Sequence, residues 1–311
     1  MESLLPRLYS EIKKSVQDCT SNNLAFSGGL DSTILAYLLK KPNTVTIIAE
    51  DFIASDLTYC QLVSKELKIK SNIETIKTEK ILEGIKNVIK ILKNFNDIEI
   101  RNSVVMYLAM DYFKKQGEKT LMTGDGADEL FAGYNFLLNK SPQELEKEQK
   151  RIWQIMHFPS QKIGKYLGIK IESPFLSQNV KKLAESIPVQ YKVKKQGSQI
   201  YGKWILRKAF EDMIPKTITW RPKSAMQDGS GTSGLSGLFD AVIQNDTFEA
   251  KKEEIAKTDR VILRTKESMH YYEIYKKHFG AIQEAKSERA CPFCRYGVDS
   301  KFCRMCGAYP V

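Results

Sequence analysis

Short apolar runs alternate with stretches of helical periodicity along the first third of the chain. Apolar residues recur at three- and four-residue spacing in residues 1–20, which predicts an opening helix. Runs of β-branched and other apolar residues predict strands at 24–26, 45–49, 72–76 and 119–123, with helices at 31–40, 55–67, 79–93 and 102–116. This alternation predicts an α/β fold with a doubly wound, mostly parallel sheet. In such sheets ligands bind at the carboxyl ends of the strands.

The first predicted strand leads into a glycine-rich turn that opens a helix, Ser27-Gly28-Gly29-Leu30-Asp31-Ser32. The two glycines let the backbone approach a ligand closely. The start of the helix offers free N–H groups to a phosphate, and Ser27 and Ser32 add hydroxyl donors. Asp31 would repel a phosphate unless Mg²⁺ lay between them. The alternative is an ordinary turn capped by Asp31 and Ser32, and the absence of a following lysine excludes a Walker A loop.

A second glycine-rich turn follows the strand predicted at 119–123. It contains Gly124, Asp125 and Asp128, in a run from Thr123 to Tyr134. Opposite a phosphate loop, an acidic turn predicts a Mg²⁺ site in which Asp128 and Asp31 each give an oxygen, with Gly124 close to the phosphates. A solvated loop whose aspartates cap a helix is the alternative.

The two turns together resemble a known family. The first resembles the PP-loop of ATP pyrophosphatases, and Thr123-Gly124-Asp125-Gly126-Ala127-Asp128-Glu129-Leu130-Phe131-Ala132-Gly133-Tyr134 resembles the second loop of the asparagine synthetase family. Further resemblances to that family's synthetase domain lie, in order, at 55–57, 100–103, 174–176, 206–210, 220–223, 228–229 and 266–272. The resemblance covers about residues 24–280. It implies a PP-loop fold of the adenine nucleotide α-hydrolase-like type.

The resemblance also implies a reaction and roles for individual residues. ATP is cleaved to AMP and pyrophosphate, a carboxylate becomes an acyl-adenylate, and ammonia then forms an amide. Asp31 and Asp128 take the family's Mg²⁺-binding positions, and Lys223 takes the place of a lysine that stabilises charge on the α-phosphate. Asp125 stands where the family has a glutamate implicated in amidation, and it is shorter by one methylene. Arg101 is a further candidate for contact with the nucleotide or the acyl phosphate.

The chain departs from the family at both its start and its middle. Residue 2 is Glu2 rather than a nucleophilic cysteine, and the sequence shows no glutaminase domain, so we expect free ammonia or a separate glutaminase as the nitrogen source. In the segment 168–177, Lys170 and Glu172 replace the family's glutamate and arginine. Two interpretations stay open here, a structural ion pair with its charges exchanged and an acceptor other than free aspartate.

The chain ends in two CxxC pairs that predict a zinc ribbon. Four thiolates at this spacing suit tetrahedral Zn²⁺ better than disulfides or a redox-active pair. The tRNA 2-thiouridine synthetases, which are also PP-loop proteins, likewise carry such a ribbon, but their further catalytic cysteines have no clear counterpart here, where only Cys19 and Cys60 remain. The proposed ligands are Cys291, Cys294, Cys303 and Cys306.

Charge is concentrated in the middle of the chain. Residues 140–225 contain 18 Lys and Arg against 7 Asp and Glu. The difference of +11 equals the net charge of the whole chain. Within this part, the basic and aromatic stretch 186–210 suggests contact with RNA, with a solvated basic face as the alternative. Neither an apolar run of about 20 residues nor a signal peptide is present, which together with the cysteine usage predicts a cytoplasmic protein without membrane contact.

These observations predict four parts: an N-terminal helix at 1–23, a PP-loop ATP-binding core at 24–140, a helical C-terminal region at 141–280 and a zinc ribbon at 281–311. The predicted function is an amide ligase that uses ATP, Mg²⁺ and ammonia and contains Zn²⁺. The ribbon, the charge and the altered segment favour a carboxylated tRNA base as acceptor over free aspartate. The alternatives are a PP-loop tRNA-modifying enzyme of another kind, for example one that adenylates a base oxygen for thiolation, and an idle nucleotide-binding scaffold.

Overall fold

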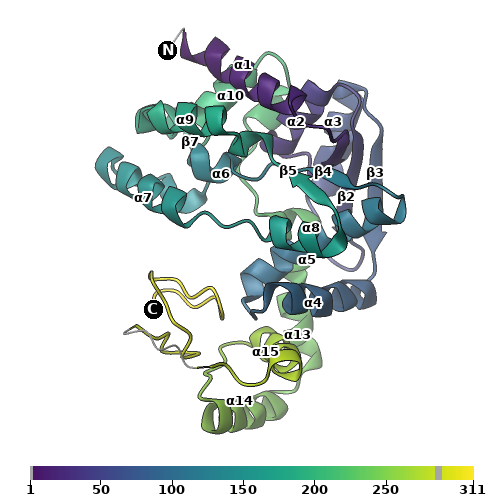
Figure 1. The fold of residues 1–311 in the computed structure, drawn as a ribbon, viewed down its shortest axis with the longest axis vertical. Helices are drawn as coiled ribbons and strands as arrows, with labels where there is room; N and C mark the ends of the chain where they lie inside the picture. The colour runs from purple at the N-terminus through teal and green to yellow at the C-terminus, as the bar shows by residue number, and fades with distance from the viewer. Residues whose placement is uncertain (1–2, 284–288) are drawn as a thin grey trace. The chain divides into compact units, whose positions relative to one another are not determined.

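The computed structural model describes residues 3–283 and 289–311, and these form two compact units (Figure 1). Unit 1 comprises residues 1–48, 55–74 and 109–225, and unit 2 comprises residues 49–54, 75–108 and 226–311. Glu2, which stands where the family has a nucleophilic cysteine, lies outside the described residues. So do residues 284–288 of the predicted zinc ribbon. The four-part division predicted from the sequence stays a prediction.

A five-stranded sheet in the order β3-β2-β1-β4-β5 forms the centre of unit 1. The β2–β1, β1–β4 and β4–β5 pairs are parallel, and Leu24 of β1 is in register with Met122 of β4. The predicted doubly wound α/β fold is confirmed, because the strand order reverses direction between β1 and β4. The strands are β1 (Asn23–Ala25), β2 (Asn43–Ala49), β3 (Ser71–Ile76), β4 (Thr120–Met122) and β5 (Lys170–Glu172).

Helices and a small hairpin complete unit 1. The hairpin pairs β6 (Lys194–Gln196) with β7 (Gln199–Tyr201) in antiparallel fashion. Short 3₁₀ turns lie at Asn135–Leu137, Pro174–Leu176 and Val189–Tyr191. The helices are α1 (Leu4–Gln17), α2 (Leu30–Leu39), α3 (Asp56–Leu67), the second half of α5 (Asp97–Lys115), α6 (Ala127–Leu130), α7 (Pro142–Ile155), α8 (Pro159–Leu167), α9 (Gln178–Ser186), α10 (Trp204–Phe210) and α11 (Lys216–Thr219).

The opening helix is an integral part of the unit 1 core. Leu8, Ile12 and Val16 of α1 are buried together with Leu24 of β1, and α1 packs against α2, α9 and α10 (Figure 1). The apolar periodicity of residues 1–20 therefore marks a face that is covered by three other helices.

Unit 2 is mainly helical. It contains α4 (Thr78–Leu92), the first half of α5, α12 (Met226–Ser230), α13 (Leu235–Val242), α14 (Asn245–Asp259) and α15 (Lys266–Phe279), with a 3₁₀ turn at Thr232–Gly234. Helix α5 begins five residues earlier than predicted, because Asn96 Oδ1 accepts a hydrogen bond from Glu99 N and so caps the helix. No helix among the described residues is both long and apolar enough to cross a bilayer.

The chain's last described segment, residues 289–311, belongs to unit 2 and is called the C-terminal module below (yellow in Figure 1). Within it the structure has turns and a single β-bridge, between Ala290 and Gly297. The module contains both CxxC pairs, and all four cysteines are buried.

Candidate active site

The two glycine-rich turns meet at the point where the sheet's strand order reverses. The first follows β1 and the second follows β4, and these strands are neighbours. A Cβ atom on Gly124 would lie 3.1 Å from Cβ of Asp31, so the turns are in direct contact. The structure thus brings together the turns that the sequence predicted to share one site.

The first turn needs glycine at position 28 for two reasons. Gly28 has a φ of +63°, and a Cβ there would lie 2.7 Å from backbone atoms of Tyr59 and Cys60. The hydroxyl groups of Ser27 and Ser32 lie 3.2 Å apart beneath the turn, and Gly29 N donates to Ser27 Oγ. The turn is therefore fixed in shape, and it directs the N-terminus of α2 at the adjoining site.

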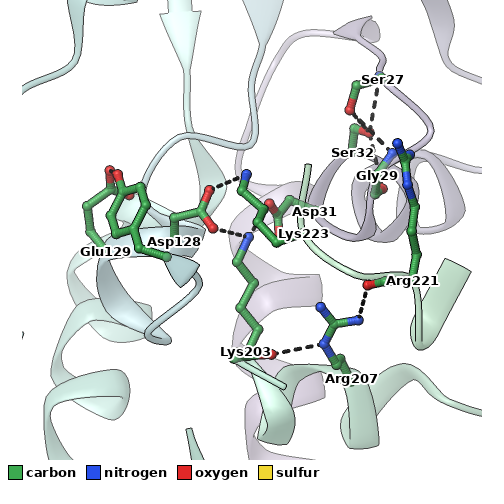
Figure 2. Close-up of polar contacts among 12 residues, drawn as sticks. Ser27, Gly29, Asp31, Ser32, Asp128, Glu129, Lys203, Arg207, Arg221 and Lys223 are labelled. Carbon is green, nitrogen blue, oxygen red and sulfur yellow. Dashed lines mark hydrogen bonds and ion pairs between the residues drawn. The ribbon is translucent and has the colours of Figure 1, made fainter. Parts of the chain in front are cut away.

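A lysine that the sequence analysis did not assign to this site lies between the two predicted metal ligands. Lys203 Nζ is 2.6 Å from Asp31 Oδ2 and 2.7 Å from Asp128 Oδ1 (Figure 2). Its side chain is only 3% exposed, so this amine faces the carboxylates rather than solvent. The sequence offered one signal, since Lys203 lies three residues before the family-like segment 206–210.

Two glycines allow close packing around Lys203. A Cβ on Gly133 would lie 2.0 Å from Asp128 Oδ1 and 2.2 Å from Lys203 Cε, and one on Gly202 would lie 2.2 Å from the carbonyl oxygen of Ala132. Lys203 N also donates to Phe131 O at 2.9 Å. The segment 131–133 and the start of α10 therefore fit closely against each other, and this packing positions the amine.

Lys223 completes the charged cluster. Its Nζ lies 2.8 Å from Asp128 Oδ2 (Figure 2). Burial opposes ionisation of Asp128, but the ammonium groups of Lys203 and Lys223 outweigh it and hold the pKa of this carboxyl below its ordinary value. Burial likewise opposes charge on Lys223, but Asp128 and Asp31 raise the pKa of Lys223 to about 12. Asp128 and Lys223 are therefore both charged at neutral pH.

The carboxylates also fit the predicted Mg²⁺. Among the described residues, Asp31 Oδ1 is buried without a hydrogen-bond partner, and Asp128 Oδ1 approaches Lys203 without hydrogen-bond geometry. Carboxylate oxygens are the ligands that Mg²⁺ prefers, usually together with substrate phosphates. Because the two lysines already balance the two carboxylates, a Mg²⁺ ion here calls for the negative charge of a pyrophosphate group as well. The Mg²⁺ site stays a prediction.

Asp125 is held through a single oxygen atom. Its Oδ2 accepts hydrogen bonds from Thr123 Oγ1 at 2.9 Å and from Ser160 Oγ at 2.5 Å. Burial raises the pKa of Asp125, while these two hydroxyl groups partly oppose the rise. Its neighbour Glu129 accepts from the Tyr134 hydroxyl at 2.5 Å, and burial together with the charge of Asp128 raises the pKa of Glu129. Asp125 therefore keeps its second oxygen for other contacts.

Arg101 is placed in unit 2. Its Nη1 lies 3.0 Å from Glu267 Oε2, and its Nε donates to Gln227 Oε1 at 3.0 Å. Glu267 is 1% exposed and also accepts from the Tyr271 hydroxyl, so Arg101 compensates a buried carboxylate. Its predicted contact with the nucleotide or acyl phosphate stays a prediction.

Arg221 contributes an arrangement that the sequence analysis did not anticipate. Its guanidinium lies 3.4 Å from the centroid of the Tyr59 ring and 3.3 Å from Asp56 Oδ1. Burial raises the pKa of Asp56 to about 6, although Arg221 opposes the shift. Arg207 in turn donates to the carbonyl oxygen of Arg221 (Figure 2) and to that of Thr219, so the segment that leads to Lys223 is held in place.

The basic stretch 186–210 is only partly available to a ligand in solution. Lys192, Lys203, Trp204 and Arg207 are buried, so these four side chains do not offer themselves to RNA in solution, and the RNA contact of the stretch stays a prediction. They are buried because each packs within the protein, for example Lys192 against the Trp153 ring at 4.6 Å. The hairpin residues 194–200 are exposed and include two lysines, Lys194 and Lys195.

The altered segment 168–177 forms the structural ion pair. Lys170 Nζ lies 2.8 Å from Glu172 Oε1. Glu172 is buried and also accepts hydrogen bonds from Thr20 N, Thr20 Oγ1 and Ser21 N, just before β1. The exchanged charges therefore have a structural explanation, and the interpretation that the acceptor differs from free aspartate stays a prediction.

The four C-terminal cysteines form a cluster that fits a metal. Their Sγ atoms all lie within 4.8 Å of one another, with 3.7 Å between Cys291 and Cys306 and 3.6 Å between Cys294 and Cys303. A tetrahedral Zn²⁺ with Zn–S bonds of about 2.3 Å places its ligands about 3.8 Å apart. The observed spacing matches that geometry and is far too long for disulfides.

The remaining two cysteines show no sign of activation. Burial, helped by the charge of Glu172, raises the pKa of the Cys19 thiol to about 11. Burial raises the pKa of the Cys60 thiol to about 12, and this thiol contacts Thr46 and the backbone of Phe26. Because the thiolate is the nucleophilic form, neither residue supports a thiolation reaction.

Comparison with known proteins finds similarity to asparagine synthetases over most of the chain. The family described as asparagine synthase matches residues 8–168 and 155–284. Asparagine synthetase (glutamine-hydrolyzing) of Gallus gallus is 28% identical over 277 residues, covering 81% of this chain and 48% of the relative. Asparagine synthetase (glutamine-hydrolyzing) of Homo sapiens is 26% identical over 289 residues, covering 86% of this chain and 51% of the relative. A probable asparagine synthetase (glutamine-hydrolyzing) of Dictyostelium discoideum is 26% identical over 320 residues, covering 92% of this chain and 56% of the relative. The chain spans about half the length of the curated relatives it matches.

Proposed function

The chain belongs to the asparagine synthase family, and from this premise we propose that it cleaves ATP to AMP and pyrophosphate in order to form an amide. The observation that carries the proposal is the charged cluster at the ends of β1 and β4. There, two lysines and two carboxylates surround the N-terminus of α2. This is an arrangement for holding a polyphosphate at a helix start.

In the first step, an oxygen of the acceptor's carboxylate attacks the α-phosphorus, and the bond to pyrophosphate breaks. Negative charge develops on the α-phosphate, and Lys223 is the fixed cation that would stabilise it. Ser27, Ser32 and the turn's backbone N–H groups would hold the departing pyrophosphate. Bound Mg²⁺ would supply further positive charge to that pyrophosphate through Asp31 and Asp128.

In the second step, ammonia attacks the acyl carbon and AMP leaves. The attacking nitrogen has to lose a proton, and Asp125 is the candidate acceptor. Thr123 and Ser160 both bond to Oδ2, which leaves Oδ1 for the incoming nitrogen. Burial also raises the pKa of Asp125 above its ordinary value, which makes its carboxylate a stronger base for this proton.

For the acceptor we propose free aspartate or a similar small acid first. Two observations support it: the Lys170–Glu172 ion pair explains the altered segment, and the relatives named above are asparagine synthetases. A carboxylated tRNA base is the second candidate, supported by the exposed lysines of the β6–β7 hairpin and by the net charge of +11. Ammonia would be supplied free or by a separate glutaminase.

The test measures pyrophosphate release with ATP, Mg²⁺ and ammonium, adding aspartate or bulk tRNA in turn. We expect aspartate to stimulate release. If only tRNA stimulates release, the acceptor is a tRNA base rather than aspartate. If neither acceptor gives release, the ligase proposal is wrong and the protein is a nucleotide-binding scaffold. Lys223→Ala should lower release by about 10²–10³-fold. Lys216→Ala, which removes an exposed lysine from the same region, is the matched control and should leave the rate unchanged.

A further inference from the structure

The C-terminal module is docked on the helical part of unit 2 through the backbone of its two CxxC turns. In the second turn, Met305 O accepts from Phe95 N at 2.9 Å, and Cys306 O accepts from Arg264 Nη2 at 3.0 Å. In the first turn, Phe293 O accepts from Ile262 N at 2.6 Å. Both turns are therefore used as contact surfaces.

The second CxxC turn fits closely against the segment that precedes α5. Gly307 has a φ of +74°, and a Cβ there would lie 2.7 Å from Asn96 Oδ1 and 3.2 Å from Asp97 Oδ1. Phe95, which donates to this turn, is 1% exposed and packs edge-on against Tyr272 of α15, with 5.1 Å between ring centroids. The module thus covers the place where α5 and α15 approach each other.

The docking residues stand immediately before two helices. Asn96 caps α5, and Arg264 precedes Thr265, whose side chain caps α15. Glu267 lies in the first turn of α15 and Arg101 in the second turn of α5, and their charged groups lie 3.0 Å apart. The module therefore holds the starting points of both helices that bear the buried ion pair.

We propose that the four cysteines bind one Zn²⁺ and that this metal clamps the starts of α5 and α15, so that the Arg101–Glu267 pair depends on it. Residues 289–311 have no helix or extended strand, so metal coordination is what would give the module a fixed shape. Without that shape, Phe95 N and Arg264 lose their acceptors. The proposal goes beyond the ligase function and does not rest on it.

The experiment compares backbone amide exchange by mass spectrometry in the zinc-loaded protein, the chelator-treated protein and two variants, together with zinc content. We expect one zinc per chain. Zinc removal should speed exchange in peptides covering 97–105 and 265–272 by about tenfold or more, because hydrogen bonds at both helix starts are lost. Peptides covering 24–39 serve as the internal reference, and their exchange should not change.

Arg264→Ala separates docking from metal binding. It should keep the zinc and yet speed exchange in 265–272, since the bond to Cys306 O and the contact of the guanidinium with the Phe293 ring are removed while all four cysteines remain. Lys277→Ala, at an exposed position near the other end of α15, is the matched control and should change neither quantity. A protein that binds no zinc would overturn the proposal. So would unchanged exchange at both helix starts after zinc removal, and so would an Arg264→Ala variant that exchanges like the wild type.

Discussion

At the scale of single residues, the site is organised around amines that neutralise carboxylates. Lys203 lies between Asp31 and Asp128, and Lys223 pairs with the second oxygen of Asp128. Two carboxylates this close to each other repel strongly unless a cation lies between them. Lys203 therefore holds the site together in the same position where a metal ion would also be stabilised.

Lys203→Met should lower the free energy of unfolding by about 3–5 kcal/mol, because it leaves buried charge uncompensated. Added Mg²⁺ should raise the melting temperature of this variant more than that of the wild type, since the two carboxylates then lack their internal cation. Thermal denaturation with and without Mg²⁺ measures both effects. Lys216→Met is the control, and an equal Mg²⁺ shift in variant and wild type would show that Lys203 does not occupy the cation position.

A second amine, that of Lys192, is buried over the Trp153 ring without a hydrogen-bond acceptor among the described residues. Lys192 is 0% exposed, its Nζ has no hydrogen-bond acceptor among the described residues, and burial lowers the pKa of Lys192 to about 7. Between that value and the unfolded value of 10.5, the unfolded chain binds one proton more than the folded chain. The stability of the wild type should therefore rise with pH through this window.

Lys192→Met removes this pH dependence. The variant should be more stable than the wild type by about 2 kcal/mol near neutral pH. This difference in stability should shrink as the pH approaches the pKa of free lysine. Urea denaturation at several pH values tests this. Lys195→Met, at an exposed position nearby, should show the wild-type pH dependence. If Lys192→Met also shows it, the buried amine is not its source.

At the scale of elements, two connections between strand and helix determine the site. Each glycine-rich turn leaves a central strand of the parallel sheet and immediately starts a helix, so that backbone N–H groups and side chains converge. The space inside these turns is limited, as the short distances from Gly28, Gly124 and Gly133 to their neighbours show. Here the backbone conformation matters as much as the side chains.

Gly28→Ala should destabilise the protein by about 1–3 kcal/mol, because alanine is strained at a φ of +63° and its Cβ would meet the backbone of Tyr59 and Cys60. It should also raise the KM for ATP. Gly237→Ala is the matched control: Gly237 lies in α13, a Cβ there meets nothing within 4 Å, and the change should be neutral or stabilising by about 0.5–1 kcal/mol. Equal melting temperatures for the two variants would contradict the strain argument.

At the scale of the whole molecule, the formal net charge differs from the charge that is exposed to a ligand in solution. The middle of the chain carries the entire excess of +11, but several of its cations are buried, and some of these are paired with carboxylates. Lys203 and Arg207 serve the internal structure, whereas Lys194 and Lys195 are exposed on the β6–β7 hairpin. Any RNA contact in this stretch would therefore be centred on the hairpin.

Replacing Lys194 and Lys195 together by glutamate tests the RNA candidate. If tRNA is the acceptor, its affinity should fall, and the salt dependence of binding should decrease by about one unit of slope for each phosphate that a lysine no longer neutralises. Binding measured over a range of salt concentrations gives both quantities. Glutamate at Lys40 and Lys41, an exposed pair elsewhere in unit 1, is the control. Turnover of aspartate should be unaffected by either double variant.

The sequence by itself determined what depends on local spacing. Alternating apolar runs predicted the α/β sheet, adjacent glycines predicted the turns, and the CxxC spacing predicted the cysteine cluster, because each is a property of residues close together in the chain. Because both glycine-rich turns follow predicted strands of one parallel sheet, the sequence also predicted that Asp31 and Asp128 share a site. The start of α5 was missed because its cap, Asn96, lies outside the apolar pattern.

Only the tertiary structure decided which partners those residues have. Lys203 reaches Asp31 across 172 positions of sequence, and Arg101 reaches Glu267 across 166. The burial of Lys192 and the docking of the CxxC turn on Phe95 are likewise invisible to composition and periodicity. The physical reason is the same in each case: long side chains and chain ends are placed by packing between distant elements, and local patterns carry no information about that packing.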